Sequence, residues 1–142
     1  MEYRCAVCSF RLWQPIARLG VSTLGLYDDA RFPGRCLLVL NEHHDDFSTL
    51  NPELTARFVA DVQLVGRAIR TALSPVRVNY ALLGNAEPHV HFHLIPRYPD
   101  DPVPDQAPWK HPDRATNLPE PERRRVVAAL QEALTRLQAA PT

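Results

Sequence analysis

The chain has 142 residues, which is enough for one domain with a buried core. Its 16 basic and 16 acidic side chains cancel, so there is neither a basic surplus to attract nucleic acid nor a polybasic patch for a membrane surface. The polar start does not resemble a signal peptide, and three cysteines do not suggest a disulfide framework. We therefore expect a cytoplasmic protein without nucleic-acid or membrane partners.

The first motif along the chain is Cys5-Ala6-Val7-Cys8. The C-x-x-C spacing allows two thiolates on a tight turn to share one metal ion, as in half of a zinc site. A redox role would require a βαβ context and a following helix N-terminus, and the sequence indicates neither. Two small buried thiols without a metal are the remaining alternative.

A hairpin is predicted next. Residues Arg18 to Leu26 alternate loosely as in a short strand, and the following turn ends in Pro33-Gly34. Leu37 to Leu40 is a continuous apolar run, which is typical of a strand buried on both faces. The turn carries two adjacent acidic residues, Asp28 and Asp29, either of which is suited to capping its own backbone.

A long amphipathic helix follows the hairpin. Asn51 is a good N-cap and Pro52 suits the first turn. The apolar residues recur at steps of three and four: Leu54, Phe58, Val62, Val65, Ile69 and Leu73. Val76 to Leu83 then reads as a strand, and Gly84-Asn85 as a turn. These elements predict an α+β fold, in which one long helix packs on an antiparallel sheet.

Three histidines share the run His89-Val90-His91-Phe92-His93-Leu94. Their period of two is that of a strand, so it predicts that all three imidazoles lie on one face. Residues two apart in a strand are separated by roughly 6.6 Å, and the outer pair by roughly 13 Å, which disfavours a single metal ion bound by all three. In the alternative, the three histidines have separate roles. One is the nucleophile, its neighbour acts on the leaving group, and the third orients the others or has a structural role. Neutral imidazole, whose usual pKa is about 6.5, is a good nucleophile.

The remainder of the chain is less informative. Residues 98–119 are rich in proline and aspartate, so we expect an extended segment that wraps the core formed by about residues 1–102. Trp109 is expected to pack on this core, with a place in a ligand pocket as the alternative. Glu120 to Ala140 is a predicted C-terminal helix, whose apolar stripe packs either on its own domain or across a dimer.

The histidine run resembles a known signature. His89 to Ile95 matches the His-φ-His-φ-His-φ-φ pattern of the histidine triad (HIT) superfamily of nucleotide hydrolases and transferases, where φ is apolar. The flanking runs, residues 79–85 and 96–102, are similar to those of a diadenosine-tetraphosphate-hydrolase-like bacterial branch. Residues 33–44 resemble the family strand that ends in a histidine. The resemblance covers roughly the first hundred residues.

This resemblance implies a two-step hydrolase. His91 would attack the α-phosphorus of a nucleoside phosphoramidate or dinucleoside polyphosphate, and water would release the nucleoside monophosphate from His91. His93 would contact the phosphate or protonate the leaving group. The transferase branch typically has Gln at the position of His93, so hydrolysis is favoured over nucleotidyl transfer. No cofactor is implied for catalysis, and a homodimer is expected because family members are commonly dimeric.

The resemblance also implies substrate-binding residues. Asn85 stands where the family has a phosphate-contacting Gln, and Asn79 resembles a second Asn that contacts phosphate or ribose. Either Asp28 or Asp29 would bind the ribose hydroxyls, and the sequence leaves that choice open. Ala86 departs from the family pattern, which often has Ser or Thr there, and this weakens any inference about the leaving group.

A structural zinc site is implied as well, with Cys5, Cys8, His44 and His89 as its four ligands. The adjacent His43 would replace His44 after a one-residue slip. Two other functions compete with the hydrolase: a nucleotide-binding module with little turnover, and a metalloenzyme that uses His89 and His91.

Overall fold

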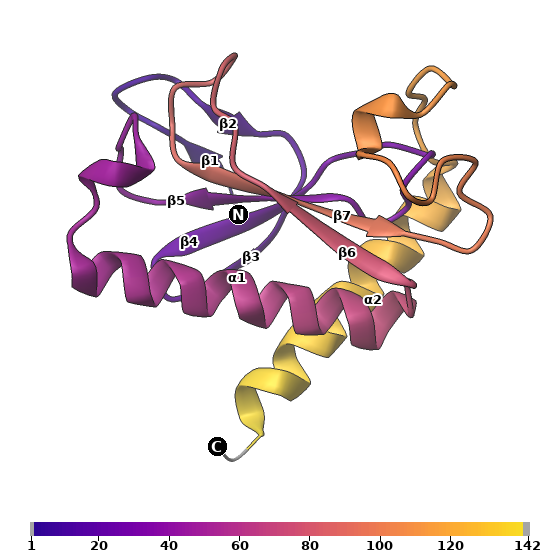
Figure 1. Cartoon of the computed structure of the whole chain (residues 1–142). Helices are drawn as coiled ribbons and strands as arrows, with labels where there is room; N and C mark the ends of the chain where they lie inside the picture. Colours follow the sequence, from indigo (N-terminus) through magenta and orange to yellow (C-terminus); the bar gives the residue numbers. More distant parts are fainter. Residues whose placement is uncertain (1, 141–142) are drawn as a thin grey trace.

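The structure is a computed structural model that describes residues 2–140. Its main sheet has five antiparallel strands in the order β3-β4-β5-β7-β6 (Figure 1). These strands are β3 (Pro15–Arg18), β4 (Ser22–Leu26), β5 (Cys36–Leu40), β6 (Arg77–Ala81) and β7 (His91–Arg97). A separate two-stranded hairpin is formed by β1 (Tyr3–Arg4) and β2 (Arg11–Leu12). With two helices added, the predicted α+β class is confirmed.

The predicted strand from Arg18 to Leu26 is in fact two strands. β3 ends at Arg18, and the chain turns through residues 19–21 before β4 begins at Ser22. In this turn the Leu19 N–H donates to the Ser22 carbonyl at 2.8 Å. The predicted hairpin is confirmed, because β4 pairs with β5 in a register that joins Ser22 to Leu40 and Leu26 to Cys36.

The predicted long helix is α1 (Pro52–Leu73). The Asn51 side chain caps it by accepting from the Leu54 N–H at 2.8 Å. Its apolar stripe packs on one face of the sheet, where the Phe58 and Phe92 rings lie 5.7 Å apart. Figure 1 shows α1 running along the sheet and α2 crossing behind α1.

The second helix, α2 (Glu120–Ala139), packs on α1 and on the edge strand β3. The apolar stripe of α2 therefore packs on its own domain, which is one of the two alternatives that the sequence left open. The buried residues are Val126, Leu130, Ala133 and Leu134. In the part of the chain described here, neither helix is apolar over enough residues to cross a membrane.

The proline-rich segment is held to the core by hydrogen bonds from a buried arginine. Arg97 donates to the Gln106 and Val103 carbonyls at 2.7 and 2.8 Å, and to Asp101 at 2.6 Å. The segment includes η2 (Pro108–Lys110), and a similar short 3-10 helix, η1 (Phe47–Thr49), precedes α1. Trp109 is 61% exposed, so the expectation that it packs on the core was wrong.

The two faces of β7 have different partners. Phe92 and Leu94 face the core beneath the helices. On the opposite face Val39, paired with His91, contacts the β1-β2 hairpin through a second apolar cluster that includes Phe10 and Leu12. The side chains of His91 and His93 therefore lie on the hairpin side of the sheet, away from the helices.

Asp61 of α1 is expected to be the most important buried polar group for the sheet edge. Its carboxylate accepts from the Val21 N–H at 2.9 Å and from the Ser22 hydroxyl at 2.6 Å, and so fixes the turn between β3 and β4. Asp61→Ala should lower the free energy of unfolding by about 2–3 kcal/mol, because it leaves these donors buried without a partner. Urea denaturation would measure this. As the control, Glu132→Ala removes an exposed ion pair with Arg136 and should change the free energy of unfolding by less than about 0.5 kcal/mol.

Candidate active site and metal cluster

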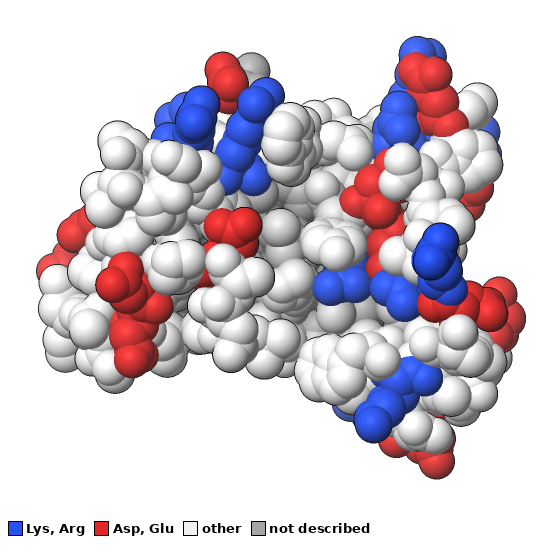
Figure 2. Space-filling model, turned by 90° about the horizontal axis from the view of Figure 1, so that it is seen from above, with Lys and Arg blue, Asp and Glu red and all other residues white. Residues whose placement is uncertain are grey.

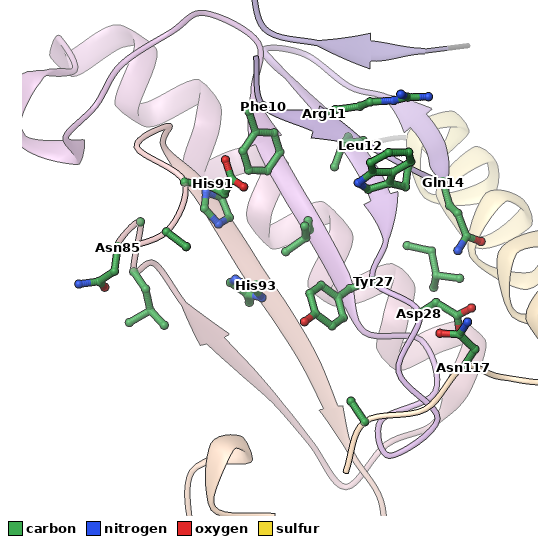
Figure 3. Close-up of a pocket in the computed structure, with 18 of the residues that line it drawn as sticks. Phe10, Arg11, Leu12, Gln14, Tyr27, Asp28, Asn85, His91, His93 and Asn117 are labelled. Atoms are coloured by element: carbon green, nitrogen blue, oxygen red, sulfur yellow. The ribbon is translucent and has the colours of Figure 1, made fainter. Parts of the chain in front are cut away.

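A pocket of about 660 Å³ lies on the hairpin side of the sheet. Its floor is formed by Leu37 of β5 and by His91 and His93 of β7. Its walls are the residues from Phe10 to Gln14, the end of β4 with the turn that follows, the loop before β7, and residues 115–117. Figure 3 shows His91 and His93 of β7 within it, with Tyr27 and Asp28 nearby. Acidic and basic side chains are interspersed over the face seen in Figure 2, so an anionic substrate would have to be bound by local groups.

His91 is held in one orientation by a hydrogen bond and by packing. Its Nδ1 lies 2.6 Å from the His89 carbonyl oxygen, which can only accept, so Nδ1 carries a proton. In the neutral ring the Nε2 lone pair is therefore free. The side chain is 5% exposed and packs against the Phe10 ring, with the two centroids 5.0 Å apart. These contacts fix the ring orientation that the sequence could only suggest.

His93 lies beside His91, with a centroid separation of 5.3 Å. Its Nδ1 is 3.1 Å from Nη2 of Arg35. Burial, followed by the charge of Arg35, lowers the pKa of His93 to about 4. Arg35 was not identified from the sequence, because a single arginine at the start of a strand carries no motif.

The two turn aspartates have different roles. Asp29 is 1% exposed and binds both Arg31 and Arg35, at 2.8 and 3.1 Å, so its carboxylate is committed inside the protein. Asp28 lines the pocket, while its Oδ1 also accepts from the Leu118 N–H at 2.9 Å. Of the two candidates, Asp28 therefore lines the pocket and Asp29 does not.

The two candidate asparagines are separated by the fold. Asn79 does not line this pocket: β6 pairs it with Ile95, beyond His93 on β7, and its side chain accepts from Arg97 at 2.8 Å. The expectation that Asn79 contacts substrate is thus corrected. Asn85 does line the pocket, although Figure 3 shows its amide turned away from His91. Gly84, with a φ of +83°, provides the turn that positions this loop.

The sequence did not identify the wall formed by the hairpin. Trp13 is 77% exposed at the pocket, and the Arg11 guanidinium lies 4.2 Å from its ring centroid. Glu87 lines the pocket too, as does Asn117 from the segment before α2. These residues are far apart in the chain and share no spacing that could have marked them as one site.

A separate cluster lies behind the pocket. One ligand atom from each of Cys5, Cys8, His43 and His89 lies within 4.8 Å of the other three. The two cysteines flank the turn between β1 and β2, where the Ser9 N–H donates to the Cys5 carbonyl. His89 is fully buried and precedes β7. Its ring packs on Tyr3 and Phe10 of the hairpin side, and Phe10 also contacts His91, so the two rings lie on the same side of the sheet, as predicted.

Hydrogen bonds orient both histidines of the cluster. His89 Nε2 lies 2.6 Å from the Leu40 carbonyl, and His43 Nε2 lies 2.7 Å from an Asp45 carboxylate oxygen. Nε2 thus carries a proton in each ring, and the two Nδ1 atoms face each other at 3.3 Å. In the neutral rings both Nδ1 lone pairs are available to a metal ion.

The distances in the cluster match those around a tetrahedral zinc ion. Bonds of 2.0–2.1 Å to nitrogen and about 2.3 Å to sulfur give edges of about 3.3 Å between nitrogens and about 3.6 Å between sulfur and nitrogen. Here the two Nδ1 atoms are 3.3 Å apart, and Cys5 Sγ lies 3.6 Å from His43. Cys8 Sγ lies 3.3 Å from His89. The donor set and its spacing therefore fit zinc.

His44 is not part of the cluster. Its ring nitrogens are directed at Thr49 and Glu42, at 3.2 and 3.3 Å. The expectation that His44 is the zinc ligand was therefore wrong, and His43 stands in its place. The chain turns just after β5 and presents His43 to the cysteines. The third cysteine, Cys36, is fully buried in the core, which raises its thiol pKa to about 12.

Comparison with known proteins identifies the family. Residues 19–100, more than half of the chain, match the model of the HIT domain. The chain belongs to the HIT family. Members of this family are nucleotide-binding hydrolases and transferases.

Solved structures of HIT proteins have the same fold. A histidine triad protein from Sinorhizobium meliloti is 28% identical with a TM-score of 0.76, over 84% of this chain and 88% of that one. A Zn-bound histidine triad family protein from Mycobacterium smegmatis is 23% identical with a TM-score of 0.64, over 89% and 87% of the two chains. A diadenosine triphosphate hydrolase from Plasmodium falciparum is 12% identical with a TM-score of 0.59, over 95% and 85%.

Proposed function

We propose that this HIT protein is a nucleotide hydrolase that cleaves at the α-phosphate through a nucleotidyl-histidine on His91. The proposed substrates are nucleoside phosphoramidates or dinucleoside polyphosphates. One observation carries the proposal: His91 donates through Nδ1 to a backbone carbonyl, which leaves Nε2 as a free nucleophile at a pocket large enough for a nucleotide.

The reaction has two steps. The Nε2 lone pair attacks the α-phosphorus, a P–N bond forms, and the bond to the leaving group breaks with its electron pair going to the leaving group. Water then attacks the same phosphorus and breaks the P–N bond, which releases the nucleoside monophosphate and regenerates His91. The His89 carbonyl accepts a stronger hydrogen bond as positive charge develops on His91, and His93 contacts the phosphoryl oxygens.

We also propose that the cluster of Cys5, Cys8, His43 and His89 holds a structural zinc ion. All four coordination positions would be taken by protein atoms, so no position is open for substrate. The ion would join the β1-β2 hairpin to the residue whose carbonyl orients His91. The Zn-bound relative from Mycobacterium smegmatis supports the choice of metal.

The experiment is a substrate panel with EDTA present. Adenosine 5′-phosphoramidate, diadenosine triphosphate and diadenosine tetraphosphate are each incubated with the protein, and AMP release is followed. A rapid denaturing quench at high pH, followed by intact-mass measurement, tests for an adenylate adduct, and peptide mapping should place it on His91.

AMP release together with the adduct is the expected result. Nucleotide binding without release from any of the three substrates would leave a binding module in place of a hydrolase. Release that EDTA abolishes at once, while the fold is retained, would instead favour a metalloenzyme.

A further inference from the structure

We propose that Arg35 is a positioning residue that holds His93 as a neutral hydrogen-bond donor, with its proton on Nε2. His93 then acts on the phosphoryl group as a donor and not as a general acid. The catalytic part of this inference rests on the proposed function, but the state of His93 does not.

The geometry between the two side chains defines the tautomer. Nη2 of Arg35 is always a donor, and it lies 3.1 Å from Nδ1 of His93. Nδ1 must therefore accept, so the single proton of the neutral ring is on Nε2. This is the reverse of His91, whose Nδ1 donates. Two adjacent histidines thus have opposite tautomers, one suited to attack and the other to donate.

Arg35 is held firmly enough for this role. Its guanidinium binds Asp29 Oδ2 at 3.1 Å and lies 3.9 Å from the centroid of the Tyr27 ring. Asp29 is itself fixed by Arg31. Nε of Arg35 is buried without a hydrogen-bond partner, the one such side-chain atom among the residues described. The other two guanidinium nitrogens of Arg35 are both used, Nη1 for Asp29 and Nη2 for His93.

The surroundings of His93 oppose a second proton. The groups that face it are the Arg35 cation, the His91 ring at 5.3 Å and the Tyr27 ring at 5.8 Å. Its neighbours in the sheet, Leu37 and Ala81, are apolar. Among the nearby carboxylates, Asp29 is already paired with two arginines, while Asp28 and Glu87 line the same pocket as His93. Burial and the Arg35 cation both oppose the imidazolium form of His93.

This state of His93 selects the leaving group. A neutral Nε2–H is a very weak acid, so it can donate a hydrogen bond but cannot protonate a departing atom. A phosphate leaving group departs as an anion without a proton, whereas an amine must be protonated to leave. Within the two proposed substrate classes, the inference therefore favours dinucleoside polyphosphates over phosphoramidates.

The test reads the tautomer directly. Long-range ¹⁵N–¹H correlation spectra of the uniformly labelled full chain distinguish the two neutral tautomers, and His93→Gln assigns the signal. We expect the Nε2–H form with no protonation above about pH 5. In Arg35→Met the tautomers should mix, and the midpoint should rise by about one unit or more toward 6.5, because a cation and a donor to Nδ1 are lost.

Arg136→Met is the control. It removes an exposed arginine whose ion pair is with Glu132 on the same helix, so the His93 signal should stay as in the wild type. An Nδ1–H tautomer in the wild type, or the same midpoint in wild type and Arg35→Met, would overturn the proposal. Because the wild-type spectrum alone decides the tautomer, an unstable variant does not prevent the test.

A kinetic measurement tests the consequence. The ratio of kcat/KM for diadenosine tetraphosphate to that for adenosine 5′-phosphoramidate should exceed one in the wild type and fall about tenfold or more in Arg35→Met at pH 6. Arg136→Met should keep the wild-type ratio. An unchanged ratio in Arg35→Met would contradict the inference that the state of His93 selects the leaving group. Absence of turnover by the wild type would contradict the proposed hydrolase function, and would leave the tautomer of His93 to the spectra.

Discussion

His91→Ala is expected to reduce AMP release by about 10,000-fold or more from every substrate that the wild type cleaves. Alanine removes the Nε2 lone pair, so no covalent intermediate forms, and attack by water must proceed without it. Because His91 is the nucleophile in the proposed first step, kcat should fall much more than KM rises. Single-turnover kinetics with enzyme in excess would measure this, together with loss of the adenylate adduct.

The control for His91 is His44→Ala. His44 follows β5 and neither lines the pocket nor belongs to the metal cluster. Turnover by His44→Ala should therefore stay within about twofold of the wild type. Nucleotide binding by His91→Ala, measured by calorimetry, separates a chemical defect from a folding defect. Near wild-type turnover in His91→Ala would contradict the covalent mechanism.

The second large effect is expected from loss of the metal. Cys8→Ser should abolish stoichiometric zinc and lower the melting temperature by about 10 °C, since an ion that binds only the folded state at about 1,000 times its Kd contributes about 4 kcal/mol. The loss is large because the ion would join the β1-β2 hairpin to His43 and to the buried His89. Elemental analysis and differential scanning calorimetry would measure both quantities.

A matched pair of variants identifies the fourth ligand. His43→Ala should lose zinc, whereas His44→Ala should retain about one ion per chain, because His43, unlike His44, directs a nitrogen at the cysteines. The opposite pattern would restore His44 as the ligand and contradict the structure. Retention of one zinc by both variants would show that neither imidazole is required.

Much of the fold could be predicted because the relevant signals are local. Asn51, Pro52 and the apolar period up to Leu73 mark a helix whose start and end agree with α1. The period of two at the histidines correctly placed His91 and His93 on one face of a strand. Where local signals were weak, the prediction was wrong: β3 and β4 were merged, since a three-residue turn at residues 19–21 has little sequence signature.

The site was predicted less completely, because it depends on contacts between distant residues. The sequence could not choose between His43 and His44 or between Asp28 and Asp29, since each pair is adjacent and chemically alike. Side-chain direction after a turn decides these choices, and that direction is set by packing. Asn79 was misplaced because its distance from His91 depends on the register between β6 and β7.

The family and the two cysteines of the cluster could be read from the sequence, as could the two histidines proposed to act in catalysis, because each is encoded by residue type at short spacing. The hydrogen-bond partners and burial of these groups required the folded chain. Arg35 is 58 residues from His93, yet it accounts for the tautomer of that ring. Residues 115–117 complete a pocket whose histidines lie on β7. Hydrogen-bond direction, charge and burial arise from contacts that are distant in sequence, and therefore appear only once the chain is folded.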